Sequence, residues 1–330
     1  MKKVLKNIFK ISILIHLSLG FMLFVGVMIP KKIYTQKEER TNELLIINCN
    51  IVDVKNGVII PNRQIFILNN RIVSIDSIIL NVPENIKMID AMGQYIMPSL
   101  WDMHLHTLSI SPQLHFPLLI ANGVTGVRDM GDGDSWISDI DNNLERDKTI
   151  WKRQSIKENL LLPKIIQATS FHVEDIEGIN KNNYKQKASE LVRKLKSRGE
   201  PFIKVQLEET EIPDYIFYEL QKEAKKQGIP ILGHLSSNLD VQKVLDNDFK
   251  SIEHAWALIP HFVKKKKILR KDIEQKKYDM TNKDTTVIKD VLIKLAKKNT
   301  YYTPTHVTSN RKEYGSLTIL VEQIASLVSI

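Results

Sequence analysis

Cysteine is nearly absent from this chain. Its 330 residues include one cysteine, Cys49, so no intramolecular disulfide can form, and a single buried thiol behaves as a small hydrophobic group. The sequence also has no internal repeat and no low-complexity tract apart from one short lysine run. These absences argue against a disulfide-stapled scaffold and a repeat array, and they leave the cellular compartment open.

An excess of acidic charge is also absent, because the formal net charge is +9 and the pI is near 9.3. Much of the basic excess lies in residues 2–10 and in the lysine run 264–267. Nucleic-acid binding needs a basic stripe with interleaved aromatic residues or a recognised module, and the sequence has neither. We therefore expect no nucleic-acid partner and interpret the charge as a solvated surface plus a targeting flank.

One long hydrophobic run stands near the N-terminus. Residues 11–29 are mostly apolar, with lysines on both sides. About 20 apolar residues span a bilayer, and no small-x-small cleavage site follows the run. We predict that residues 1–42 form an uncleaved signal anchor plus a linker, with residues 11–30 in the membrane and the remaining chain outside the cytoplasm. A cleaved signal peptide and a buried core helix are the alternatives.

Residues 43–96 carry short β-rich runs that turn residues separate. The runs cover 45–54, 58–60, 64–68, 71–75 and 87–90. Short strands at this spacing predict a small antiparallel sheet or sandwich.

From residue 97 onward, short apolar strands alternate with helical patterns. We expect strands at 97–103, 124–129, 163–168, 201–206, 230–234, 250–254 and 301–306, and helices at 191–198, 215–226, 241–246, 287–298 and 317–328. This alternation predicts an α/β fold with a parallel sheet and right-handed crossovers. Because histidines stand at the C-terminal ends of several strands, the expected closure is a TIM-like (β/α) barrel, whose active site lies on that face.

Two histidines end the first of these strands, in the segment 97–106, which reads MPSLWDMHLH. Residues two apart in a strand point to the same side, so His104 and His106 can direct two imidazoles at one metal ion. A His-x-His pair alone is a weak signal. Its place at a strand end, with further histidine-bearing strands after it, makes the signal much stronger.

This segment resembles the first barrel strand of the amidohydrolase superfamily, usually written Pro-Gly-Leu-Ile-Asp-x-His-x-His, with Ser99 and Trp101 in place of Gly and Ile. Later segments resemble strands of the prolidase-like and imidazolonepropionase-like branch, in the family order: GVTGVRDMG at 123–131, FIKV at 202–205, GHL at 233–235, SIEHA at 251–255 and YTPT at 302–305. The resemblance extends over residues 43–330.

The resemblance implies a metal-dependent hydrolase barrel over residues 97–330, preceded by part of a composite β-sandwich over residues 43–96. His234 and His254 occupy the remaining histidine-ligand positions of the family. Lys204 stands in an apolar strand, where a buried charge is costly. The family implies that this lysine is carboxylated and bridges two metals, and the alternative is a lysine that points outward. The implied cofactor is one or two divalent ions, zinc first.

The sequence offers about seven barrel strands where the family has eight. We therefore expect an incomplete TIM-like (β/α)8 barrel preceded by a small β-sandwich segment, in a chain that is a fragment or a truncated product. The family assigns proton transfer to an Asp after the eighth strand, and no catalytic Asp is found for that role here. We therefore expect little or no hydrolase activity from this chain by itself.

Three further residues are weaker candidates for substrate contact. Arg128 could hold a substrate carboxylate, although a salt bridge with Asp129 or another acid is an alternative. His172 follows the third strand and His306 ends the seventh, so both could line the pocket. The basic insert 260–283 is either a lid or a solvated loop.

These observations predict a metal-dependent amidohydrolase that hydrolyses the C–N bond of a small amide or dipeptide with a metal-activated water. The alternative is a catalytically inactive metal- or ligand-binding remnant of such an enzyme. Turnover distinguishes the two.

Overall fold

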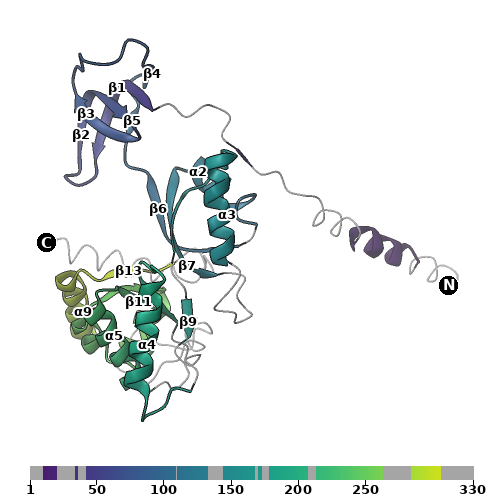
Figure 1. The fold of residues 1–330 in the computed structure, drawn as a ribbon, viewed down its shortest axis with the longest axis vertical. Coiled ribbons are helices and arrows are strands. Elements are labelled where there is room, and N and C mark those ends of the chain that lie inside the picture. The colour runs from purple at the N-terminus through teal and green to yellow at the C-terminus, as the bar shows by residue number, and fades with distance from the viewer. Residues whose placement is uncertain are drawn as a thin grey trace.

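The computed structural model describes residues 10–20, 34–35, 42–108, 110–132, 144–167, 170–172, 178–206, 213–262 and 284–305. Within these ranges the chain forms one mixed sheet near its N-terminus, followed by two parallel sheets with helices (Figure 1). The helix expected at 317–328 and the lysine run at 264–267 lie outside the described residues.

The predicted membrane anchor is not found in the described residues. A helix covers residues 10–20, and its apolar side chains, among them Leu14 and Leu17, are exposed. Crossing a bilayer takes about 20 apolar residues, and no helix in the described part of the chain is both long and apolar enough to do so. The predictions of a signal anchor, of a membrane partner at residues 11–30 and of the localisation built on them are therefore wrong. Residues 21–33 lie outside the described ranges.

Five strands between residues 43 and 96 form one sheet around β1. They are β1 (Glu43–Asp53), β2 (Val58–Leu68), β3 (Arg71–Asp76), β4 (Lys87–Asp90) and β5 (Tyr95–Ile96), in the order β3-β2-β1-β4, with β5 also paired to β1. β1 runs antiparallel to β2 and parallel to β4 and β5. The sheet is thus mixed rather than purely antiparallel, and the composite sandwich stays a prediction.

The runs expected at 58–60 and 64–68 join into the single strand β2. Pro61 stands between them, and a proline removes a backbone donor from the ladder. The register between β1 and β2 shifts at this point, from Cys49 opposite Arg63 to Ile51 opposite Ile60. Pro61 therefore lies in a bulge, where the missing donor is tolerated and the strand can continue.

The first parallel sheet carries the His-x-His pair. Its strands are β6 (Leu100–Thr107), β7 (Val124–Asp132) and β8 (Lys164–Gln167), in that order, and α2 (His115–Ala121) and α3 (Leu144–Lys157) lie between them in the chain. Phe116 packs edge-on against Trp151 with ring centroids 5.3 Å apart, and Leu160 completes the cluster. Among the described side chains, this small cluster is the apolar core between the sheet and its helices.

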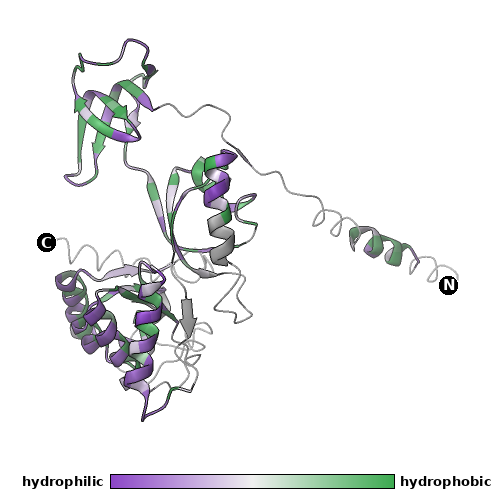
Figure 2. Cartoon of the chain, viewed as in Figure 1, coloured by the Kyte–Doolittle hydropathy of each residue, from purple (hydrophilic) through white to green (hydrophobic). Residues whose placement is uncertain are grey.

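The second parallel sheet is larger, and its strands lie in chain order: β9 (Ser170–His172), β10 (Ile203–Gln206), β11 (Ile231–Gly233), β12 (Phe249–Glu253) and β13 (Tyr301–Thr303). The accompanying helices are α4 (Tyr184–Ser197), α5 (Asp214–Gln227), α6 (Val241–Asp246), α7 (Ala255–Leu258), η2 (Ile259–His261) and α9 (Thr285–Lys298). One contiguous core, with Phe217 and Phe249 inside it, joins helices and strands. The visible sides of α4, α5 and α9 are largely hydrophilic (Figure 2).

Local signals set the boundaries of these helices. The side chains of Asp240 and Asp284 accept hydrogen bonds from backbone amides in the first turns of α6 and α9, which is the usual role of an N-cap residue. Helix α5 ends at Gly228, whose φ of 68° is left-handed. Glycine adopts this conformation without steric cost, so it ends the helix cleanly.

The α/β class with parallel sheets is confirmed, and each of the seven expected strand ranges contains a strand. β8 ends at Gln167, and β9 begins at Ser170, beyond the third expected range of 163–168, and pairs with β10. β8 and β9, which are consecutive in the chain, thus belong to different sheets. An incomplete TIM-like barrel made of both sheets stays a prediction.

Candidate metal centre

Four histidines from three strand ends lie next to one another. His104 and His106 lie on β6, His234 follows β11 and His254 follows β12. The ring centroid of His104 lies 5.3 Å from that of His106 and 4.5 Å from that of His254. The rings of His234 and His254 lie 4.9 Å apart. The two parallel sheets therefore bring their histidines together in one cluster.

The backbone at two of these strand ends allows little variation in sequence. Gly233 has a φ of +136°, and a Cβ there would stand 2.1 Å from the carbonyl oxygen of Val205. Only glycine fits, so β11 can lie close to β10 directly before His234. At the end of β12, the backbone amide of His254 donates to the carbonyl oxygen of Thr303 at 2.8 Å, which joins the ends of β12 and β13.

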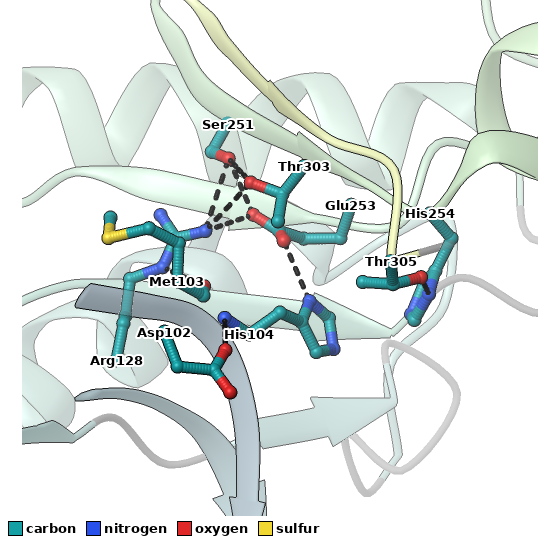
Figure 3. Close-up of polar contacts among 9 residues, drawn as sticks. All are labelled: Asp102, Met103, His104, Arg128, Ser251, Glu253, His254, Thr303 and Thr305. Carbon is teal, nitrogen blue, oxygen red and sulfur yellow. Dashed lines mark hydrogen bonds and ion pairs between the residues drawn. The ribbon is translucent and has the colours of Figure 1, made fainter. Parts of the chain in front are cut away.

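A carboxylate fixes the orientation of the His104 ring. Nδ1 of this ring lies 2.7 Å from Oε2 of Glu253 (Figure 3). Because a carboxylate only accepts, Nδ1 donates and Nε2 keeps its lone pair. Nε2 is buried and has no hydrogen-bond partner among the described residues. His106 is oriented by a weaker acceptor, since its Nδ1 lies 3.2 Å from the carbonyl oxygen of Gly131.

Glu253 is buried at the end of β12 and is bound at both oxygens. Nη2 of Arg128 donates to Oε1 at 2.7 Å, and the Ser251 hydroxyl donates to the same oxygen at 2.5 Å. Burial raises the pKa of the Glu253 carboxyl, but the hydrogen bond from His104 and the charge of Arg128 outweigh it, so the pKa lies below its ordinary value. The group is therefore a carboxylate in the folded chain.

Burial keeps the imidazoles of β6 neutral. It is the largest cause that lowers the pKa of His106 to about 4, and the charges of His104 and Lys204 add to it. Burial also lowers the pKa of His104, although the hydrogen bond to Glu253 opposes this shift. Neutral imidazole is the form that binds a metal ion, so both rings are ready to act as ligands near neutral pH.

Lys204 lies on β10 and is 1% exposed, so it does not point outward into solvent. Burial lowers the pKa of its ammonium group to about 8, against the opposing attraction of Glu253. Its charge also lowers the pKa of His104 and His106. On β10 its backbone pairs with Leu232 of β11, two residues before His234. The amine becomes neutral at mildly alkaline pH and can then act as a nucleophile.

The weaker candidates differ in what the structure says of them. Arg128 forms a buried ion pair with Glu253, so the acid in the alternative salt bridge is Glu253, and a substrate contact stays a prediction. His172 lies on β9, where its backbone pairs with Gln206, while its side chain lies outside the described residues. All of His306 lies outside them as well.

Sequence reasoning missed three residues around the cluster. Glu253 orients His104, Ser251 holds Glu253, and Oγ1 of Thr305 lies 2.7 Å from Nδ1 of His254. Glu253 had a signal, because an acidic residue at the end of a buried apolar strand needs a partner inside the protein. The two hydroxyl residues had none, since Ser and Thr are common at strand ends and turns.

No protein-family model and no curated protein matches this chain, but solved structures do. A prolidase in complex with N-methylphosphonate-L-proline matches with a TM-score of 0.54 and 15% identity, over 80% of this chain and 66% of that one. A Xaa-Pro dipeptidase with methionine bound in the active site matches with a TM-score of 0.53 and 17% identity, again over 80% and 66%. The ochratoxinase of A. niger matches with a TM-score of 0.52 and 13% identity, over 86% and 72%. The chain has the prolidase-like fold of the amidohydrolase superfamily.

The resemblance inferred from the strand motifs is thus confirmed for this amidohydrolase fold. At identities of 13–17% the likeness concerns the fold alone. The chain spans just under two thirds of the length of the matched prolidase and dipeptidase, with 66% of each covered.

The amidohydrolase fold implies a metal ion, and the histidine cluster fits one in its donor chemistry. In the part of the chain that the structure describes, no group of three or more His, Cys, Asp or Glu side chains is arranged so that it could hold an ion. The rings of the cluster instead pack against one another. The buried Nε2 of His104 nevertheless carries a lone pair that no described residue engages, and coordination to a metal ion would engage it.

Proposed function

We propose that this chain is a metal-dependent amidohydrolase that hydrolyses the C–N bond of a small amide or dipeptide. The five proposed ligands lie on or directly after four strands, β6, β10, β11 and β12, and would hold one or two divalent ions, zinc first. They are His104, His106, Lys204, His234 and His254. The matched prolidase, Xaa-Pro dipeptidase and ochratoxinase structures support the reaction class through their common fold.

One observation carries the proposal, and it is the state of the His104 ring. Its Nδ1 is bound to Glu253 at 2.7 Å, while its Nε2 is buried without a partner among the described residues. A buried polar atom without a hydrogen bond costs free energy. Metal-binding histidines have this arrangement, because the second nitrogen donates to a carboxylate or carbonyl and the first faces the ion.

The other ligands need only small rearrangements in this proposal. The four rings already lie within 4.5–5.3 Å of their neighbours. Rotation about side-chain bonds would turn them from packing against each other to facing one ion. Gly233 and the hydrogen bond between His254 and Thr303 hold the backbone at two of these positions, so the rearrangement stays within the side chains.

A bound divalent ion would supply a Lewis acid that polarises the scissile carbonyl and lowers the pKa of a water molecule. The chain's own residues keep the imidazoles neutral and oriented. The neutral amine of Lys204 can attack carbon dioxide: an N–C bond forms, one C–O π bond opens to leave negative charge on oxygen, and the nitrogen releases a proton to water, which gives a carbamate. A carbamate is a carboxylate-like oxygen ligand that suits hard and borderline metal ions.

The two parallel sheets support a partial barrel as the frame of this site. Arg128 on β7 reaches the end of β12 through Glu253, and His104 on β6 reaches the same carboxylate. Strands from the first sheet therefore face strands from the second across a common interior. We propose that β6 to β13 form an incomplete TIM-like barrel, and that the sheet of residues 43–96 is part of a composite sandwich.

Metal content tests the proposal. Full-length protein should retain roughly one to two equivalents of a divalent ion in elemental analysis after gel filtration. The double substitution His104→Ala and His106→Ala should remove most of that ion. His115→Ala is the matched control, because His115 lies on α2 and contacts Ser111 rather than the cluster.

Turnover then separates an enzyme from an inactive metal-binding remnant. The wild-type chain with added zinc would be assayed against dipeptides and N-acyl amino acids, and product amines would be measured by mass spectrometry. Turnover that disappears with the two histidines supports the proposed enzyme. Metal content that is the same in the double variant and the wild type would refute the site.

A further inference from the structure

We propose that Glu253 is the positioning residue of the metal centre: it holds the His104 ring in the tautomer and orientation that present Nε2 to the ion, and Arg128 holds Glu253. The inference rests on the proposed function. It gives Glu253 and Arg128, which are not among the proposed metal ligands, the role of positioning one of those ligands. Figure 3 shows Glu253 between the other two side chains, with dashed lines that join it to Arg128 and to His104.

The carboxylate is fixed at both ends, so it can serve as a rigid support. Oε2 accepts from Nδ1 of His104 at 2.7 Å, and Oε1 accepts from Arg128 and from the Ser251 hydroxyl. Rotation of the carboxylate would break charge-assisted hydrogen bonds in a buried site, where such bonds are strong. The ring of His104 therefore keeps one tautomer even before an ion binds.

Arg128 ties this support to the strand that carries the ligand. Its Nε donates to the carbonyl oxygen of Met103 at 2.7 Å, and Met103 directly precedes His104 on β6. The guanidinium thus holds both the backbone beside His104 and the acceptor of its ring. It also neutralises the Glu253 carboxylate, which would otherwise be an uncompensated buried charge.

The two histidines of β6 provide an internal comparison. His104 donates to a charged acceptor at 2.7 Å, whereas His106 donates to the neutral carbonyl oxygen of Gly131 at 3.2 Å. An anionic acceptor makes the opposite ring nitrogen more electron-rich and a stronger ligand. His104 is therefore the better ligand of the pair, and this difference originates in Glu253.

The experiment compares Glu253→Leu, which has no acceptor, with Glu253→Gln, which keeps a neutral one. Nitrogen-15 NMR of metal-free, histidine-labelled full-length protein reports the protonation of each ring nitrogen, and the signals lost in His104→Ala identify His104. We expect Nδ1-H alone in wild type and in Glu253→Gln, and a substantial Nε2-H fraction in Glu253→Leu. Zinc affinity, measured against a chromogenic chelator, should fall roughly 10-fold for Gln and roughly 100-fold for Leu.

Glu223→Gln is the control, because Glu223 is another largely buried glutamate that pairs with Lys226 on α5 and does not touch the cluster. It should leave the zinc affinity and the His104 tautomer unchanged. If Glu253→Leu does not fold, Glu253→Gln decides alone, and a wild-type zinc affinity in that variant overturns the inference. An unchanged His104 tautomer in folded Glu253→Leu overturns it as well. If the wild-type chain binds no zinc, the proposed function fails, while the tautomer measurement still tests Glu253.

Discussion

The two parallel sheets each supply two histidines to the cluster, yet they are stabilised differently. The sheet β9–β13 shares one continuous apolar core with its helices. As far as its side chains are described, the sheet β6–β8 has a small core around Phe116, and Leu100, Trp101 and Met103 on β6 remain 52%, 39% and 43% exposed. One sheet is thus a well-packed support, and the other depends on contacts beyond its own core.

Some of those contacts are apolar, because Met130 and Ile166 of the first sheet pack against Phe202 and Leu232 beside and within the second. The others are polar. Arg128 and His104 from the first sheet meet Glu253 from the second. Apolar burial is non-directional, whereas hydrogen bonds fix geometry. A site divided between two sheets therefore gains its alignment from the polar bridge, while its free energy of unfolding comes mainly from the larger core. The following substitutions test that division, in order of expected effect.

The largest effect is expected from Gly233→Ala in the well-packed sheet. The new Cβ would overlap the Val205 carbonyl oxygen, and its backbone conformation suits glycine alone, so the free energy of unfolding should fall by more than about 4 kcal/mol. Gly57→Ala is the control, because Gly57 also has a positive φ but its Cβ would meet nothing within 4 Å. It should cost about 1 kcal/mol. Urea unfolding measures both, and equal losses would contradict the close approach of β10 and β11.

Truncation of a core aromatic residue should affect the two sheets differently. Phe217→Ala removes a ring from the large core and should lower the free energy of global unfolding by about 4 kcal/mol. Phe116→Ala removes an equally buried ring from the small core, and it should mainly increase local opening of β6–β8. Hydrogen exchange by mass spectrometry distinguishes the two. If Phe116→Ala accelerates hydrogen exchange equally in both sheets, the two sheets are not stabilised by separate cores.

The third-largest effect is expected from breaking the polar bridge between the two sheets. Arg128→Met leaves the Glu253 carboxylate buried without its cation, which should cost about 3 kcal/mol and raise exchange where the two sheets meet. Lys225→Met is the control, since its ion pair with Asp248 is exposed and contributes about 0.5 kcal/mol or less. Thermal unfolding and exchange give the readout. If the polar bridge contributes nothing to stability, both variants should show the same thermal unfolding and the same hydrogen exchange.

The smallest effect concerns acid stability of the second sheet. Burial lowers the pKa of His261 to about 4, although a hydrogen bond to the Ser236 backbone opposes the shift. The unfolded chain then binds more protons below pH 6.5, so stability present at pH 7 is lost as the pH falls toward 4. The loss attributable to His261 should be about 2 kcal/mol at pH 5. Denaturant unfolding of wild type and His261→Gln at both pH values measures it, and identical pH slopes would disprove the assignment.

Local patterns allowed the strands and the His-x-His pair to be predicted, and the resemblance to the amidohydrolase superfamily added His234 and His254. Apolar strands and amphipathic helices are short-range signals, and the spacing of His104 and His106 is visible within one strand. The Pro61 bulge was missed because it depends on the register with β1. Glu253 was missed because its partner His104 lies 149 residues away in the sequence. The membrane prediction failed because it rested on an apolar run alone, and no helix in the described ranges is long and apolar enough to cross a membrane.

The sequence separation between His104 and Glu253 also has a consequence during biosynthesis. Glu253 lies 149 positions after His104, a stretch that takes roughly 7–30 s to translate at about 5–20 residues per second. Throughout that interval the His-x-His segment belongs to a nascent chain in which no carboxylate selects its tautomer. We expect any ion that binds in this interval to be held no more tightly than by an ordinary exposed pair of histidines. In the proposed metal centre, firm loading would begin after residue 253 has left the ribosome, so completion of β12 would determine when that centre can mature.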